Sequence, residues 1–298
     1  MTSNAFNLGN LRLAVLIDAE NVPRNSMKRV MEEIAIYGTP TIKRIYGDWT
    51  SPVVAGWKAS LLENAITPIQ QYSYTTGKNS SDSAMIIDAM DILYTDKTDG
   101  FVLVSSDSDF TRLAIRLREA GQRVIGIGER KTPSAFKAAC DKFTYIEVIN
   151  ERFARTDSKK KDTQNEGQGL HEVSAHRTEH DQNEGLDQNE LEVQNGTQPH
   201  GAHRGRTYHT EKHRGEKVPE DVVKIIADSV ADLADDSGMV FMGELGNLIL
   251  KKQPDFDHRS FGYKSLSAMI KSIDRFETDF RHTTDPNIKH VFVRDKES

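Results

Sequence analysis

Hydrophobic and polar positions alternate in two distinct ways over the first 150 residues of this 298-residue chain. Short, nearly unbroken apolar runs, which predict buried strands, lie at residues 11–17, 41–46, 66–72, 101–104, 123–128 and 145–149. Apolar residues three and four positions apart, which predict amphipathic helices, lie at residues 24–37, 52–64, 82–93, 110–120 and 134–139. This alternation predicts an α/β domain with a doubly wound, mostly parallel sheet and helices on both faces.

Acidic residues follow the ends of two of these strands. Asp18 comes directly after the first strand, and Asp107 and Asp109 follow the strand at residues 101–104. These two strands are predicted to be neighbours at the point where the strand order reverses, and ligands of open α/β sheets bind there, beyond the carboxyl ends of the strands. Asp82, which begins a helix after a polar loop, is expected to join them.

Two interpretations of these aspartates remain open. Asp107 and Asp109 could cap the helix that begins near Phe110, because an Asp at a helix N-terminus accepts hydrogen bonds from unpaired N–H groups. Alternatively, four converging carboxylates would repel one another and raise their pKa values unless a cation lay between them. Mg²⁺ or Mn²⁺, which prefers such hard oxygen ligands, is the predicted cofactor. The role of Asp48, at the end of another strand, is left undecided.

The residue types of the first domain restrict its chemistry. Residues 1–150 contain no histidine, and Cys140 is expected to be buried, so triads and imidazole catalysis are excluded there. A metal held by carboxylates activates water for attack on a phosphodiester. Candidate substrate contacts are Asn21, Ser105 or Ser106, and Lys78, although Lys78 can equally be a solvated loop residue.

The composition changes after residue 150. Residues 151–217 are rich in Gln, Asn, Glu, His and Gly, and seven of the ten histidines lie there without cysteines to complete a zinc site. Such a segment cannot bury a core, so we expect a disordered linker that lets the domains on either side orient independently. The chain has no apolar stretch of membrane-spanning length and no signal-peptide pattern, so we expect a soluble, cytoplasmic protein.

Residues 218–298 predict a small winged-helix α+β domain. Helices are expected from Pro219, over 242–250 and over 266–273, followed by a hairpin of strands 276–281 and 290–294. The third helix and the wing of such domains usually contact nucleic acid. Eleven Lys and Arg stand against fifteen Asp and Glu here, which disfavours general backbone binding and favours a structured RNA or a protein ligand.

Three ordered motifs in the first domain carry a family resemblance: residues 16–21 (Leu-Ile-Asp-Ala-Glu-Asn), Gly77-Lys78 followed by Asp82, and residues 104–110 (Val-Ser-Ser-Asp-Ser-Asp-Phe). Residues 11 to about 150 resemble the NYN family of PIN-like metal-dependent ribonucleases. The resemblance implies an acidic catalytic and metal-binding site, supported by Asn21 and made of Asp18, Asp82, Asp107 and Asp109.

The C-terminal domain has a resemblance of its own. Residues 241–247, 256–263 and 266–270 are similar to an OST-HTH/LOTUS domain, a winged helix associated with RNA that in extended members also binds proteins. The sequence therefore favours a ribonuclease acting on single-stranded RNA, with a tethered RNA-recognition module. The alternatives are a non-catalytic RNA- or protein-binding adaptor, and a phosphatase with Asp18 as nucleophile.

Overall fold

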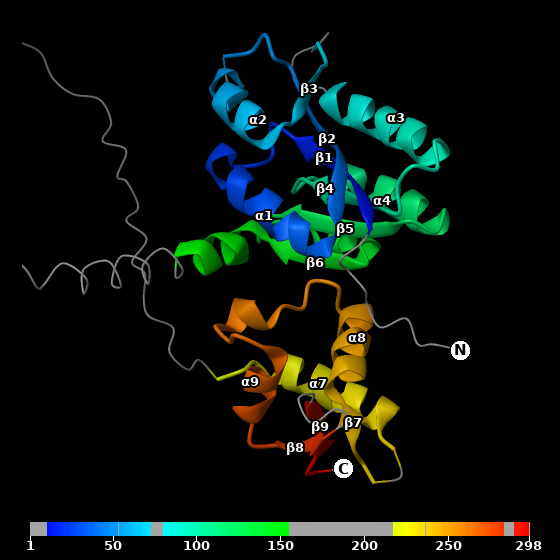
Figure 1. Cartoon of the computed structure of the whole chain (residues 1–298), viewed down its shortest axis with the longest axis vertical. Coiled ribbons are helices and arrows are strands. Elements are labelled where there is room, and N and C mark those ends of the chain that lie inside the picture. The colour runs from blue at the N-terminus through cyan, green and yellow to red at the C-terminus, as the bar shows by residue number, and fades with distance from the viewer. Residues whose placement is uncertain are drawn as a thin grey trace, which may run out of the picture.

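The structure is a computed structural model with two domains (Figure 1). It describes residues 11–52, 54–72, 80–154, 217–235, 237–282 and 289–297. The first domain ends with helical residues 146–154, and the second begins at residue 217. Most of the predicted linker, and the loop that carries Lys78, lie outside the described residues.

A six-stranded parallel sheet in the order β3-β2-β1-β4-β5-β6 forms the centre of the first domain. Its strands are β1 (Arg12–Asp18), β2 (Thr39–Gly47), β3 (Thr67–Gln70), β4 (Gly100–Val104), β5 (Arg123–Gly128) and β6 (Lys142–Tyr145). β1 and β4 pair directly, and the strand order reverses between them. The predicted doubly wound sheet and the predicted pair of strands at its switch point are both confirmed.

Helices cover both faces of this sheet. They are α1 (Met27–Tyr37), α2 (Lys58–Asn64), α3 (Ser80–Tyr94), α4 (Thr111–Glu119) and α5 (Ser134–Ala139). The apolar side chains of α1 and α2 pack in one core cluster with Ile146, Ile149 and Phe153, and those of α3, α4 and α5 pack in another. The strands between them are buried on both sides, which is why they appear in the sequence as continuous apolar runs.

The boundaries of several elements differ from the sequence predictions, for example in the following two cases. The last strand was expected at residues 145–149, but β6 ends at Tyr145 and residues 146–154 are helical. A short apolar run fits a buried helix segment as well as a strand, so the pattern alone could not separate them. The helix expected over residues 52–64 is shorter, because a 3-10 turn (Ala55–Trp57) precedes α2.

The second domain has the predicted three helices and hairpin. Its elements are α7 (Glu220–Leu233), β7 (Val240–Phe241), α8 (Met242–Lys252), a 3-10 helix (His258–Phe261), α9 (Leu266–Lys271), β8 (Phe276–His282) and β9 (Lys289–Asp295). β9 lies between β7 and β8 in an antiparallel sheet. The two-residue strand β7 was not predicted, because two residues are too few to show an alternating pattern.

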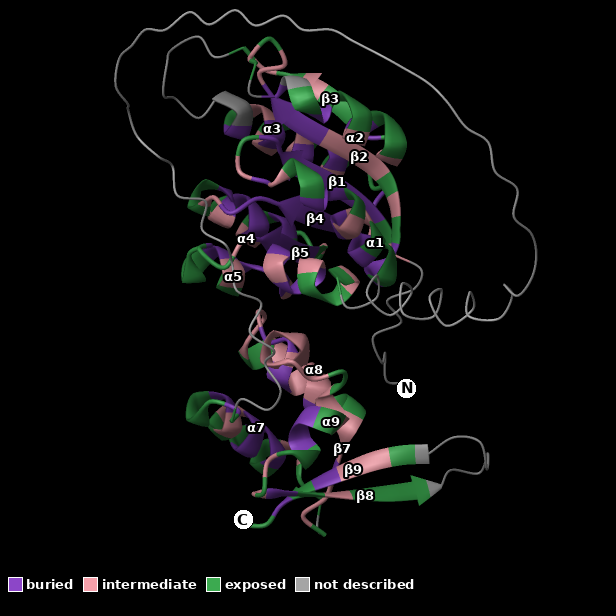
Figure 2. Ribbon diagram, turned by 90° about the vertical axis from the view of Figure 1, so that its left-hand side faces the viewer, coloured by how far each residue is buried: buried purple, intermediate pink, exposed green. Residues whose placement is uncertain are grey.

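The two domains lie next to each other (Figure 2). They touch through residues 254–259 of the second domain, which contact residues of α1, α5 and β6 of the first. The Phe143 N–H donates to the Pro254 carbonyl at 2.8 Å. Asp255 accepts hydrogen bonds from Lys137 Nζ at 3.0 Å and from the Tyr145 hydroxyl at 2.5 Å. We call this contact the domain junction. The two domains are in contact in this structure, and their independent orientation stays a prediction.

An ion-pair network lies at the centre of the domain junction. Arg259 donates to both oxygens of Glu33, at 3.0 and 2.7 Å, and also pairs with Asp257 at 2.6 Å. The Glu33 side chain is 1% exposed and accepts further hydrogen bonds from Tyr37 and Arg152. A carboxylate buried this deeply needs such partners. The second domain supplies one of the partners of Glu33, the guanidinium of Arg259.

Candidate metal site

Hydrogen bonds within the polar turn after β4, residues 105–109, fix the positions of its side chains. Asp107 is in an extended conformation, and its Oδ1 accepts a hydrogen bond from the Asp109 N–H at 3.0 Å, which caps the 3-10 helix Ser108–Phe110. The Asp107 N–H in turn donates to Ser105 Oγ at 3.0 Å. The capping interpretation of Asp107 is therefore correct locally, and it leaves the second carboxylate oxygen of Asp107 available for another ligand.

Asp18 is fixed at the end of β1 by hydrogen bonds to both of its oxygens. Its Oδ1 accepts from the Glu20 N–H at 3.0 Å, and its Oδ2 accepts from Asn21 Nδ2 and from Ser105 Oγ, each at 2.8 Å. The carboxylate is 1% exposed. Since Ser105 Oγ also accepts from the Asp107 N–H, a continuous hydrogen-bond chain joins Asn21, Asp18, Ser105 and Asp107 across the two central strands.

Three carboxylates converge beside this chain. Asp82 in the first turn of α3, Asp107 and Asp109 each present an oxygen, and these oxygens lie within 4.8 Å of one another. Hard carboxylate oxygens at this spacing suit Mg²⁺ or Mn²⁺, which is held by a few carboxylates and keeps several waters. Asp18 is not part of this triad, although it lies close enough to influence Asp82 electrostatically.

The electrostatics of the site reflect the crowding of negative charge. Burial is the largest cause that raises the pKa of Asp82, and together with the charges of Asp18, Asp107 and Asp109 it brings that pKa to about 7. Burial also raises the pKa of Glu20, followed by the charges of Asp18 and Asp48. A bound cation would offset this repulsion, so the triad fits a divalent ion on its own chemistry.

Family comparisons agree with this arrangement of motifs. A model of the NYN domain matches residues 12–147, and a model of the OST-HTH/LOTUS domain matches residues 215–288. The chain therefore contains an NYN domain followed by an OST-HTH/LOTUS domain. Both domains indicate an RNA-related function, and the NYN domain indicates a nuclease family that uses divalent metals.

The solved structures that resemble this chain include two proteins without an assigned function. One, from Vibrio parahaemolyticus, shares 19% identity at a TM-score of 0.40 and covers 48% of this chain and 94% of its own. The other, from Nitrosomonas europaea, shares 30% identity at a TM-score of 0.25 and covers 35% of this chain and 91% of its own. A comparison with curated proteins found no match. None of the helices in the described ranges has the length and apolarity to span a membrane.

The structure separates the candidate residues that the sequence grouped together. Ser105 faces Asp18, whereas Ser106 Oγ accepts a hydrogen bond from the Glu129 N–H at 2.9 Å and so joins the end of β5. Lys78 lies outside the described residues and stays a prediction. Burial raises the pKa of the Cys140 thiol to about 12, as expected for an inert core cysteine. Sequence reasoning missed Glu20, whose only signal was its place between Asp18 and Asn21.

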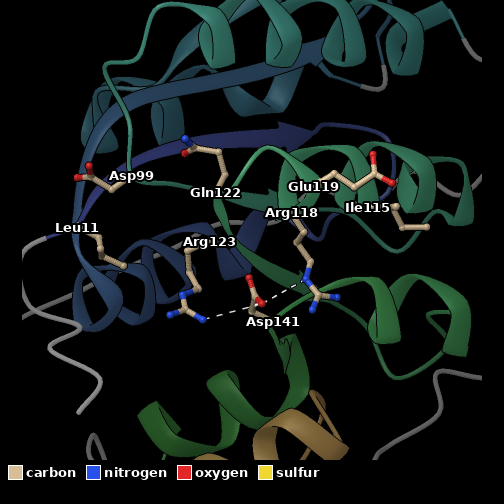
Figure 3. A pocket seen from close by; sticks show the side chains of 9 residues that line it. Leu11, Asp99, Ile115, Arg118, Glu119, Gln122, Arg123 and Asp141 are labelled. Carbon is tan, nitrogen blue, oxygen red and sulfur yellow. Dashed lines mark ion pairs between the residues drawn. The ribbon is translucent and has the colours of Figure 1, made fainter. Parts of the chain in front are cut away.

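A hollow of about 670 Å³ lies at the amino ends of the strands of the NYN sheet, opposite the carboxyl ends where the aspartates lie (Figure 3). Its lining includes Leu11, Asp99 and Arg123, which stand at the starts of β1, β4 and β5. Asp141 pairs there with Arg118 at 3.2 Å and with Arg123 at 3.9 Å. Ligands of open α/β sheets bind at the carboxyl ends of strands, so this hollow is not the candidate active site.

The raised pKa of Asp82 predicts how stability changes with pH. The pKa of Asp82 is about 7 in the folded protein and has its ordinary value of 3.8 in the unfolded chain, so the folded protein holds this proton more tightly. The parent should therefore lose stability as the pH rises through about 7. In EDTA, melting curves from pH 5 to 8 should show this loss in the parent and not in Asp82→Asn, with a size set by about 1.4 kcal/mol per pKa unit. Mn²⁺ should remove the difference. Parallel pH profiles would contradict the crowded-carboxylate description.

Proposed function

We propose that the NYN domain hydrolyses phosphodiester bonds of single-stranded RNA with Mg²⁺ or Mn²⁺ held by Asp82, Asp107 and Asp109. The observation that supports this most directly is the convergence of three carboxylate oxygens within 4.8 Å, beside the switch point of the sheet. When bound, the ion supplies an activated water and stabilises the charge that develops on the phosphate. Carboxylates that only capped helices would have no reason to converge at a mutual electrostatic cost.

The remaining residues of the site are proposed to position these carboxylates. Asn21 and Ser105 both donate to Asp18 Oδ2, so their hydrogen bonds point to the site's interior and not to a substrate. Buried Asp18 accepts a hydrogen bond from Ser105, and Ser105 accepts one from the Asp107 N–H, so Asp18 positions the backbone of Asp107 beyond the ends of the strands. Asp18 thus acts as a positioning residue with a charge that raises the pKa of Asp82. The OST-HTH/LOTUS domain is proposed to recognise RNA while docked at the domain junction.

The test of the function is cleavage of a labelled single-stranded RNA by the purified full chain. Cleavage should require Mn²⁺ or Mg²⁺ and stop with excess EDTA, and Mn²⁺ should raise the melting temperature, because a ligand that binds only the folded state stabilises it. A chain that binds the RNA but neither cuts it nor responds to Mn²⁺ would instead be the non-catalytic adaptor.

Two adjacent serines offer a matched test of the positioning role. Ser105→Ala removes the hydroxyl between Asp18 and Asp107, and Ser106→Ala removes the acceptor of the Glu129 N–H. Each leaves a polar group without its partner, at about 1–3 kcal/mol of stability. Only Ser105→Ala should also weaken Mn²⁺ binding, by roughly 10- to 100-fold, as for other outer-shell changes. Equal Mn²⁺ affinities in calorimetric titrations of the two variants would exclude the proposed chain.

A further inference from the structure

The domain junction borders an open hollow of about 540 Å³ that is lined by residues of both domains. The NYN domain lines it with residues that include Tyr37, Lys142 and Arg152. The OST-HTH/LOTUS domain contributes residues that include Phe256, His258 and Lys264. Its volume falls within the range of roughly 300–1,000 Å³ that is typical of small-molecule sites, and such sites occur preferentially between domains.

Positive charge exceeds negative charge around this hollow. The carboxylates that line it, Glu33 and Asp257, both accept hydrogen bonds from Arg259, and Glu33 also pairs with Arg152 at 2.9 Å. Both carboxylates are therefore already paired with Arg152 or Arg259. Lys142 and Lys264 also line the hollow, and neither ammonium group has a hydrogen-bond acceptor among the described residues.

Lys142 is the more informative of the two lysines. It is partly buried at the start of β6, and its ammonium lies 5.7 Å from the centre of the Tyr37 ring. Burial lowers the pKa of Lys142, and the attraction of Asp257 opposes this effect in part. An ammonium carries three donors, and a charge in a partly desolvated position is normally paired. Such a lysine beside a hollow indicates that an anion completes its surroundings.

The rest of the lining indicates what carries the anion. Met242, Leu250 and Leu266 of α8 and α9 make an apolar wall. Gly243 and Gly246 in α8 leave that wall without long side chains. A pocket with apolar and cationic lining residues suits a ligand that has a ring at one end and a phosphate at the other. We propose that this hollow binds a nucleotide, with Lys142 and Lys264 as donors to its phosphate.

This proposal does not depend on the nuclease site, so its test omits divalent metal. Calorimetric titrations of the full chain in EDTA should show saturable binding of AMP and weaker binding of inorganic phosphate and of adenosine. Lys142→Gln should lower the affinity for AMP by about tenfold or more, as expected for one lost charge-assisted hydrogen bond. Lys142→Arg should retain most of it. Lys251→Gln, on α8 but in the lining of a neighbouring hollow, is the matched control and should bind AMP like the parent.

The phosphate can belong to a free nucleotide or to the 5′ end of an RNA strand, and short RNAs with a 5′-phosphate or a 5′-hydroxyl distinguish these sources. A Lys142-dependent preference for the 5′-phosphate assigns the site to strand ends, and a response to AMP alone assigns it to free nucleotides. Lys264→Gln, an exposed change, provides the same comparison if Lys142→Gln does not fold. Absence of saturable binding by every phosphate probe, or equal AMP affinity in parent and lysine variants, would overturn the proposal.

Discussion

Replacing Asp107 by Asn is expected to abolish metal-dependent RNA cleavage while leaving the metal-free fold intact. The amide oxygen of Asn can still accept the Asp109 N–H that Asp107 Oδ1 accepts now. The substitution removes one of three converging charges, so the pKa of Asp82 should fall. The metal-free variant should therefore be as stable as the parent or more stable, by about 1.4 kcal/mol for each pKa unit relieved.

The same substitution weakens the proposed metal site. A carboxylate ligand of Mg²⁺ or Mn²⁺ is lost, and the charge stabilisation that a bound ion supplies is worth several kcal/mol, or about 10³-fold in rate. Cleavage and the Mn²⁺-dependent rise in melting temperature should disappear together. Asp91→Asn, an exposed change on the same helix as Asp82, serves as the control and should behave like the parent.

Thermal melts and cleavage assays of these two variants, with and without Mn²⁺, distinguish the candidate functions. If Asp107 only caps a helix, losing its charge near the helix N-terminus should cost roughly 0.3–1 kcal/mol and leave any response to metal unchanged. If parent and Asp107→Asn cut RNA equally, a contaminating nuclease explains the cleavage. A parent whose melting temperature does not respond to Mn²⁺ would exclude the metal site.

Arg259→Met is expected to open the domain junction. It leaves Glu33, which is 1% exposed, with only Tyr37 and Arg152 as partners among the described residues. It also removes the guanidinium that pairs with buried Asp257, which then keeps, in the described part of the chain, only the hydrogen bond from the backbone N–H of residue 259. Removing one member of a buried ion pair typically costs about 3–5 kcal/mol. The chain can avoid that cost by separating its domains, because Glu33 and Asp257 then reach water. We therefore expect a larger radius of gyration in X-ray scattering and a lower melting temperature.

A second variant shows whether the orphaned charge is the cause. Glu33→Gln combined with Arg259→Met removes both charges, and the double-mutant cycle should recover part of the lost stability. Arg294→Met, which breaks an exposed pair with Glu277 in the same domain, is the matched control and should change stability by less than about 1 kcal/mol. An unchanged radius of gyration in Arg259→Met would show that the junction does not depend on this network.

The junction should also weaken in acid. Burial alone would raise the pKa of Glu33, but the hydrogen bonds and charge of Arg259 outweigh it and hold the pKa below its ordinary value of 4.5. A carboxyl with a lowered folded-state pKa stabilises the structure above its unfolded pKa and loses that contribution as pH falls further. The domain junction is therefore expected to be intact at neutral pH and to weaken as the pH falls below about 4.5.

Local hydrophobic patterning was enough to predict most of the NYN domain's architecture. Strands buried on both faces need continuous apolar runs, and helices need apolar residues at three- and four-residue spacing, so both appear in the sequence directly. Right-handed connections then restrict the strand order, and the carboxyl ends of β1 and β4 meet where the sequence placed Asp18 and Asp107. The convergence of Asp82 with Asp107 and Asp109 follows from that topology.

Side-chain direction was decided only by the tertiary structure. Ser105 and Ser106 are identical in type and adjacent in sequence, yet one bonds Asp18 of β1 and the other bonds the backbone after β5. Neighbouring residues in an extended segment point to opposite sides, and which side faces the site depends on the strands that pair with it. The pattern likewise could not place Glu20 next to the carboxylates or end β6 at Tyr145.

The domain junction could not be predicted from the sequence, for a related reason. Glu33 and Arg259 are 226 positions apart, and each occurs in a segment whose local pattern predicts an ordinary surface residue. Periodicity reports which face of an element is buried within its own domain, but a contact between domains depends on two surfaces that fold separately. The sequence therefore determined the two domains and the location of the acidic site, whereas folding in three dimensions decided how the domains meet and what lies between them.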